Sequence, residues 1–136
     1  MSLPPRHIAV LDDDLSVRNA IRRLLEASGL RVTCHSTGMQ LLAAMEAESP
    51  DCLVLDLQMP GMSGTDILHY LDHIDARLPI IIITAHDDVG SPDLCLAAGA
   101  TAYLRKPLDA EELLLAIDDA VRRFALAHVD QGPIEP

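Results

Sequence analysis

Short apolar runs alternate with segments whose apolar residues recur at helical spacing, and this alternation constrains the fold more than any other feature. The apolar runs span residues 8–11, 30–34, 52–55, 80–83 and 101–105. The helical patterns end before Gly29, cover 37–48, follow Gly64, cover about 91–98 and run from about 109 to 126. Unbroken apolar runs are typical of strands covered on both faces of a parallel sheet, and the more polar run 30–34 is expected at an edge. Five strands separated by helices predict a doubly wound α/β fold with right-handed crossovers.

The length and the chain ends indicate one domain without a membrane segment. The 136 residues correspond to a single domain, and no apolar run approaches the roughly 20 residues that span a bilayer. The N-terminal extension, residues 1–6, is not followed by a signal-peptide pattern, so we expect a cytoplasmic protein. Residues 127–136 lack periodicity and contain two prolines, which predicts a tail or the start of a linker.

Charge and cysteine usage exclude several classes of function. The formal net charge of −11 argues against direct binding to nucleic acid, because such a surface repels phosphate backbones. Cys34, Cys52 and Cys95 form no CxxC pair, so we expect three reduced thiols. Of the ten basic residues only Lys106 is a lysine, so its place in the chain requires an explanation.

Polar residues follow the strongest predicted strands. Asp12 and Asp13 follow the first strand, Asp56 the third, Thr84 the fourth and Lys106 the fifth. The carboxyl ends of parallel strands meet at one edge of an open sheet, where ligands bind. The predicted sheet therefore gathers carboxylates, one hydroxyl and the single lysine in one place.

This collection of groups suits phosphoryl transfer. Clustered carboxylates need positive charge among them, and an all-oxygen site suits Mg²⁺. Asp12 and Asp13 are expected to hold the metal, which leaves Asp56 to attack phosphorus as a nucleophile. Thr84 would donate a hydrogen bond to the transferred group, and Lys106 would pair with its charge.

Four segments resemble the signature of the response-regulator receiver domain: residues 11–14 (Leu-Asp-Asp-Asp), 55–64 (Leu-Asp-Leu-Gln-Met-Pro-Gly-Met-Ser-Gly), 83–86 (Ile-Thr-Ala-His) and 103–107 (Tyr-Leu-Arg-Lys-Pro). The resemblance covers residues 7–126, which we take as the domain. It implies a flavodoxin-like five-stranded parallel sheet in the order 2-1-3-4-5 with five helices. It also implies that the chain is a signalling switch that assists only its own phosphorylation and dephosphorylation, not an enzyme with a separate substrate.

The resemblance assigns roles to individual residues. Asp56 would accept a phosphoryl group from a histidine kinase. Mg²⁺ would be held by Asp13, Asp56 and the backbone carbonyl of Gln58, with Asp12 nearby through water. Thr84 and Tyr103 would form the switch pair.

Further family features concern the neighbours of these residues. Gln58 and His86 occupy the positions that tune the lifetime of the phosphoryl group. The family also implies a small residue at Ala85 and a cis bond between Lys106 and Pro107. Residues 87–93 depart from the family pattern, because added acid, glycine and proline predict a late-starting or mobile fourth helix.

Plainer interpretations apply to some residues. Asp14 is expected to cap the first helix rather than to bind metal. His69 and His73 lie four residues apart on a predicted helix, which could suit a metal, but a solvated helix face is the favoured interpretation.

Rival functions fit the sequence less well. A haloacid-dehalogenase-type phosphatase would place a second Asp two residues after the nucleophile, where Gln58 stands. A flavodoxin-like carrier would need a neutral loop after the first strand, where three Asp residues stand. A degenerate receiver acting only as a binding module would not need the complete acidic set.

The four segments also bear on the output of the switch. The residues of the four segments resemble those of receivers attached to transcriptional output domains. The alternative is a stand-alone receiver that docks on another protein. The expected partners are a histidine kinase and an output domain or docking protein, and a phosphorylation-dependent homodimer remains open.

Overall fold

The computed structural model describes residues 5–57, 59, 61–85, 96 and 99–130. Its centre is a sheet of five parallel strands in the order β2-β1-β3-β4-β5. The strands are β1 (His7–Leu11), β2 (Arg31–His35), β3 (Cys52–Asp56), β4 (Ile80–Thr84) and β5 (Ala102–Arg105). This order confirms the topology that the resemblance implied, and β2 lies at an edge, as its polar sequence predicted.

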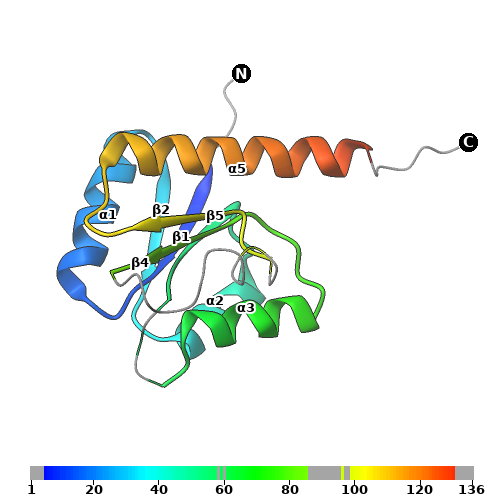
Figure 1. Cartoon of the computed structure of the whole chain (residues 1–136), viewed down its shortest axis with the longest axis horizontal. Helices are drawn as coiled ribbons and strands as arrows, with labels where there is room; N and C mark the ends of the chain where they lie inside the picture. Colours follow the sequence, from blue (N-terminus) through cyan, green and yellow to red (C-terminus); the bar gives the residue numbers. More distant parts are fainter. Residues whose placement is uncertain (1–4, 58, 60, 86–95, 97–98, 131–136) are drawn as a thin grey trace, which may run out of the picture.

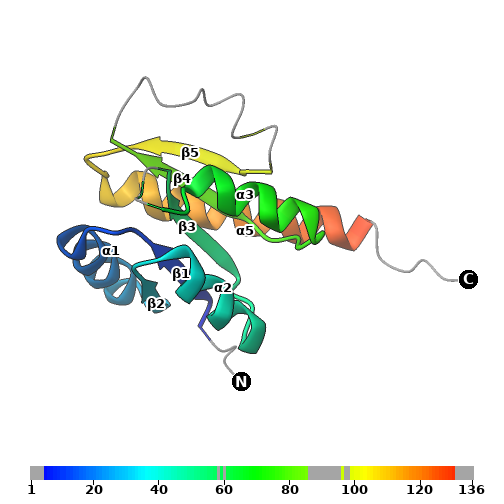
Figure 2. The ribbon, with the colours of Figure 1, turned by 90° about the horizontal axis from the view of Figure 1, so that it is seen from below.

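Helices cover both faces of the sheet (Figures 1 and 2). They are α1 (Leu15–Ala27), α2 (Gly38–Ala47), α3 (Gly64–His73) and α5 (Ala110–Asp130). Side chains of α1 and α5 pack on one face with Val10, Val54 and Ile83, while α2 and α3 pack on the other with Leu11 and Leu55. Successive residues of a strand point to opposite faces, so each central strand contributes to both cores. None of the described helices is long and apolar enough to cross a membrane.

Local signals in the sequence explain where two helices begin and where one ends. Asp14 is the N-cap of α1, as predicted, and its side chain accepts hydrogen bonds from the backbone of the first turn. Ser63 and Asp66 form a capping box at the start of α3. Gly29 follows α1 with a φ of 87°, a left-handed conformation that glycine adopts without strain.

Several strand and helix ends shift by one residue from the predictions, and three differences concern the site or the length of a helix. Asp56 and Thr84 are the last residues of β3 and β4 rather than the first residues after them. Helix α5 continues to Asp130, beyond the expected end at residue 126. The predicted helix at 91–98 and the atypical segment 87–93 fall almost entirely outside the described residues, so the four helices counted above belong to the described part of the chain.

Candidate functional site

Four polar residues converge at the carboxyl edge of the sheet. Asp12 directly follows β1, and Asp56 ends β3. Thr84 ends β4, and Lys106 directly follows β5. Asp12, Asp56 and Thr84 expose 0%, 3% and 0% of their surface. The structure thus brings together the residues that the strand ends predicted.

Asp12, Asp13 and Asp56 form an acidic cluster in which one carboxylate oxygen of each lies within 4.8 Å of the others. Asp12 and Asp56 are buried, whereas Asp13 is exposed. No other group of three potential ligands of this kind exists among the described residues. Neighbouring carboxylates repel one another unless a cation lies among them. An all-oxygen set with one exposed member fits Mg²⁺, which binds through a few carboxylates and keeps several waters.

Lys106 places a positive charge beside the acidic cluster. Its Nζ lies 2.9 Å from Oδ2 of Asp12 and 3.7 Å from Oδ2 of Asp56. Burial by itself lowers the pKa of Lys106, but the hydrogen bond and charge of Asp12, together with the other carboxylates, outweigh burial and raise it. Lys106 is therefore a permanent cation at neutral pH, already directed at the acidic cluster.

Asp14 does not belong to the acidic cluster. Its Oδ1 accepts hydrogen bonds from the backbone N of Ser16 at 2.8 Å and from the hydroxyl of Ser16 at 2.7 Å. These bonds, with a weaker one from the backbone of Val17, lower the pKa of the Asp14 carboxyl. The side chain is therefore occupied at the start of α1, which confirms the prediction of a capping role.

Gly64 holds the start of α3 against the backbone of Asp56. A Cβ at this position would lie 2.5 Å from the carbonyl oxygen of Asp56 and 2.8 Å from the Cα of Leu57. The Gly64 N–H donates to the Leu57 carbonyl at 3.0 Å. The signature segment contains Gly64, but only the structure explains why glycine is needed there: any side chain would push α3 away from the end of β3.

Thr84 and Tyr103, the predicted switch pair, lie on adjacent strands. Tyr103 is paired with Ile82 in the β4–β5 register, so Tyr103 and Thr84 face the same side of the sheet. Thr84 is buried, and Tyr103 is half-buried against the core that α2 and α3 cover. The Lys106–Pro107 peptide bond is cis, as the resemblance implied.

Several predicted positions lie elsewhere or outside the described residues. Gln58 and His86, the lifetime positions, are outside the described residues, and so is the Gln58 carbonyl expected at the metal. Ala85 is exposed directly after β4. His69 and His73 are exposed on α3 and belong to no three-residue ligand group among the described residues.

The described cysteines have no place in the site. Cys34 and Cys52 are free thiols, and Cys95 is outside the described residues. Burial raises the pKa of Cys52 to about 12, which keeps its thiol protonated and unreactive.

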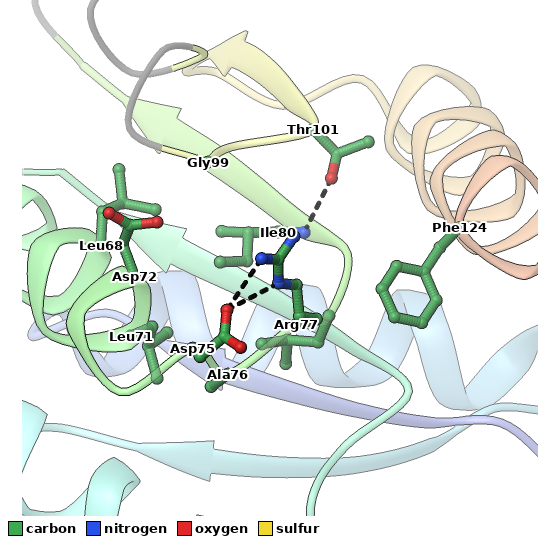
Figure 3. A pocket seen from close by; sticks show the side chains of 11 residues that line it. Leu68, Leu71, Asp72, Asp75, Ala76, Arg77, Ile80, Gly99, Thr101 and Phe124 are labelled. Carbon is green, nitrogen blue, oxygen red and sulfur yellow. Dashed lines mark hydrogen bonds and ion pairs between the residues drawn. The ribbon is translucent and has the colours of Figure 1, made fainter. Parts of the chain in front are cut away.

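A cavity of about 240 Å³ lies at the other end of the strands, beside the first residue of β4 (Figure 3). It is lined by the end of α3, the first residue of β4, and Phe124 of α5. The Thr101 hydroxyl accepts a hydrogen bond from the Ile80 N–H at 3.1 Å, and Arg77 pairs with Asp75 at 2.8 Å. Ile80 begins the strand that Thr84 ends, so this cavity is separate from the acidic cluster.

The comparisons with known proteins agree on one family. The family model of the response regulator receiver domain matches residues 8–118. The chain is 36% identical over 115 residues to the DNA-binding transcriptional regulator NtrC of Salmonella typhimurium, covering 85% of this chain and 24% of that protein. It is 37% identical over 132 residues to the response regulator MprA of a Mycobacterium species (strain KMS), covering 97% of this chain and 56% of that protein. A crystal structure of a response regulator receiver domain protein from Clostridium thermocellum matches with a TM-score of 0.80 and 34% identity, covering 90% of this chain and 98% of that one.

The chain therefore belongs to the response regulator receiver domain family, the phosphoacceptor domains of two-component signalling. Membership of this family decides against the phosphatase and the electron carrier as interpretations of the fold. The chain spans about a quarter of the length of the NtrC relative and about half that of the MprA relative, at 24% and 56%.

Proposed function

We propose that Asp56 is the phosphoacceptor of this receiver domain. The observation that carries the proposal is the position of its buried carboxylate, within 4.8 Å of the oxygens of Asp12 and Asp13 and with the Lys106 ammonium 3.7 Å away. A carboxylate oxygen of Asp56 attacks the phosphorus of a phosphohistidine on a histidine kinase. The phosphorus–nitrogen bond breaks, and its electron pair stays with the imidazole, which leaves.

The site is suited to stabilise the charge of the transferred group. Asp13 and Asp56 would hold Mg²⁺ together with the Gln58 carbonyl, and Asp12 would contribute through water. The bound ion supplies charge neutralisation for the phosphoryl oxygens. The Lys106 ammonium would form an ion pair with the phosphoryl group, and the Thr84 hydroxyl would donate a hydrogen bond to the same group.

The phosphoryl group then acts as a switch. The added negative charge at Asp56 draws the Thr84 hydroxyl toward it, and the half-buried Tyr103 ring moves into the space that this shift opens. By the resemblance to the family, Gln58 and His86 would set how long the phosphoryl group survives. The domain changes only its own phosphorylation state and turns over no separate metabolite.

Residues 7–126 act as one receiver domain that controls an output. The output is a transcriptional domain in the cytoplasm, because the chain resembles regulators named for transcription and for response regulation. A histidine kinase is the upstream partner. A stand-alone receiver that docks on a separate protein would undergo the same chemistry at Asp56. The two alternatives differ only in which domain or protein recognises the phosphorylated receiver.

One experiment tests the phosphoacceptor. The protein is incubated with Mg²⁺ and acetyl phosphate, and its intact mass is recorded beside that of Asp56→Asn. We expect one added phosphoryl group that requires Mg²⁺ and is absent from the variant. Lack of an adduct in the wild type, with beryllofluoride also failing to bind in the presence of Mg²⁺, would show that the domain is a receiver-like docking module instead.

A further inference from the structure

We propose that Arg18 is a positioning residue for the acidic cluster: it fixes the peptide group between Asp12 and Asp13 and so directs the Asp13 carboxylate toward the metal. The inference rests on the proposed function, because it assigns a role within the same Mg²⁺ site. It concerns a residue outside the signature segments, on α1, whose contact only the fold reveals.

The contact is a short hydrogen bond from a helix to the end of a strand. Nη1 of Arg18 donates to the backbone carbonyl of Asp12 at 2.7 Å. Arg18 lies in the first turn of α1, and its own N–H donates to the Asp14 carbonyl at 3.0 Å. Long side chains on a helix point back toward its N-terminus, so this reach needs no unusual geometry. The half-buried guanidinium therefore ties the start of α1 to the acidic end of β1.

Asp12 and Asp13 are held in different ways. The side chain of Asp12 is fixed at both oxygens, by the N–H of Asp14 at 2.9 Å and by the Lys106 ammonium at 2.9 Å. The exposed Asp13 carboxylate makes no hydrogen bond or ion pair with any residue that the structure describes. With no contact of its own to hold it, the position of this side chain depends on where the backbone places its Cβ.

Arg18 restrains the backbone between Asp12 and Asp13. The carbonyl of Asp12 and the N–H of Asp13 belong to one planar peptide group, so fixing the carbonyl oxygen also fixes the Cα of Asp13. Groups that orient the ligands of a metal commonly change its affinity by 10- to 100-fold when they are lost. A guanidinium that holds this peptide plane orients a metal ligand in the same way, although it touches neither the metal nor the transferred group.

The positive charge of Arg18 predicts the opposite effect, and this contrast makes the proposal testable. A nearby cation repels Mg²⁺, so an effect of charge alone would tighten binding when Arg18 is neutralised. Loss of positioning would weaken binding. Arg22, one helical turn further along α1, is exposed and makes no contact with the acidic cluster, so Arg22→Gln removes the same charge without the hydrogen bond.

Mg²⁺ affinity is measured directly by calorimetric titration of the wild type, Arg18→Gln, Arg18→Lys and Arg22→Gln. We expect a dissociation constant on the order of 10-fold higher for Arg18→Gln, whose amide is too short to reach the Asp12 carbonyl. We expect partial recovery for Arg18→Lys, which keeps a donor on a longer side chain, and no weakening for Arg22→Gln. In phosphorylation by acetyl phosphate, Arg18→Gln should raise the Mg²⁺ concentration at half-maximal rate but not lower the rate at saturating Mg²⁺. A variant that is merely less folded would lose amplitude without shifting this midpoint.

A second measurement separates this proposal from the proposed function. Amide hydrogen exchange without metal should be faster at the Asp14 N–H, which donates to the Asp12 side chain, in Arg18→Gln than in the wild type or Arg22→Gln. If the wild type binds no Mg²⁺, the proposed function fails, and the exchange rates still decide whether Arg18 orders this turn. Unchanged affinity and unchanged exchange in Arg18→Gln, or tighter binding in both glutamine variants, would overturn the positioning role.

Discussion

The ammonium of Lys106 lies 2.9 Å from Oδ2 of Asp12, which is fully buried at the end of β1. The distance from the same ammonium to Asp56 is longer, at 3.7 Å. In this state the lysine lies closer to the carboxylate that has no exposure to water than to Asp56, the acceptor that we propose. Movement of Lys106 toward a phosphorylated Asp56 would therefore remove the ion-pair partner of Asp12. A bound cation would then have to balance the negative charge of Asp12.

Removal of Lys106 should destabilise the protein most when no metal is present. Lys106→Met leaves the buried Asp12 carboxylate without its ion-pair partner, and we expect a loss of about 2 kcal/mol in the free energy of unfolding. Urea denaturation in EDTA and in saturating Mg²⁺ checks this, because the cation should restore much of the loss. The double variant Lys106→Met with Asp12→Asn should be more stable in EDTA than the single variant. An equal loss with and without Mg²⁺ would contradict the compensation.

Asp13 and Asp14, although adjacent, should respond to substitution in opposite ways. Asp13→Asn removes an exposed candidate ligand and should weaken Mg²⁺ binding on the order of 10-fold or more, without lowering stability in EDTA. Asp14→Ala removes the N-cap of α1 and should lower the urea midpoint, while Mg²⁺ affinity changes little. Calorimetric titration and urea denaturation of both variants give the comparison. Similar Mg²⁺ affinities for the two variants would be inconsistent with the separate roles.

Gly64→Ala should disturb both stability and the proposed acceptor site around Asp56. The added Cβ would meet backbone atoms of Asp56 and Leu57, which cannot rotate away as a side chain could. We expect a loss of about 1–3 kcal/mol in the free energy of unfolding and slower phosphorylation by acetyl phosphate. Thr65→Ala, an exposed change at the next position of α3, is the matched control. If both variants unfold at the same urea concentration, the close approach is not a constraint.

Much of the fold is predictable because the sequence patterns are local. Runs such as 80–83 are apolar throughout, and a strand buried on both faces needs that composition. Their exact ends are less predictable, since Asp56 and Thr84 continue the strand hydrogen bonding although they are polar. Helix α5 also extends beyond the predicted end at residue 126, because the apolar stripe fades while Ala125 and Ala127 still favour the helix.

The candidate site is likewise predictable only in part. Strand order brings Asp12, Asp56 and Lys106 to one edge, and this follows from topology alone. Which carboxylate Lys106 contacts more closely depends on a difference in distance of less than 1 Å, and no sequence pattern contains that difference. The contacts of Arg18 with the Asp12 carbonyl and of Gly64 with the end of β3 are tertiary as well. They involve backbone atoms, which every residue type carries, so these contacts cannot be predicted from the identity of the residues contacted.

A buried histidine predicts how stability depends on pH. His7 is buried at the start of β1, and burial, followed by the charge of Arg31, lowers its pKa below the ordinary 6.5 against the raising effects of Glu48 and Asp51. Burial and the nearby His7 lower the pKa of His35 in the same direction. The unfolded chain therefore binds more protons than the folded protein once the pH falls below about 6.5. Stability should be fully present above that pH and decrease as the pH falls toward the lowered pKa of the folded state.

The measurement is the free energy of unfolding between pH 7.5 and 5.5, taken from urea denaturation. His7→Phe removes the titrating group together with its 2.9 Å hydrogen bond to Thr33, so its absolute stability will change for two reasons. The slope against pH isolates the titration, and we expect it to be flatter in His7→Phe than in the wild type. Equal slopes for the wild type and His7→Phe would mean that His7 takes up its proton in the folded protein as readily as in the unfolded chain.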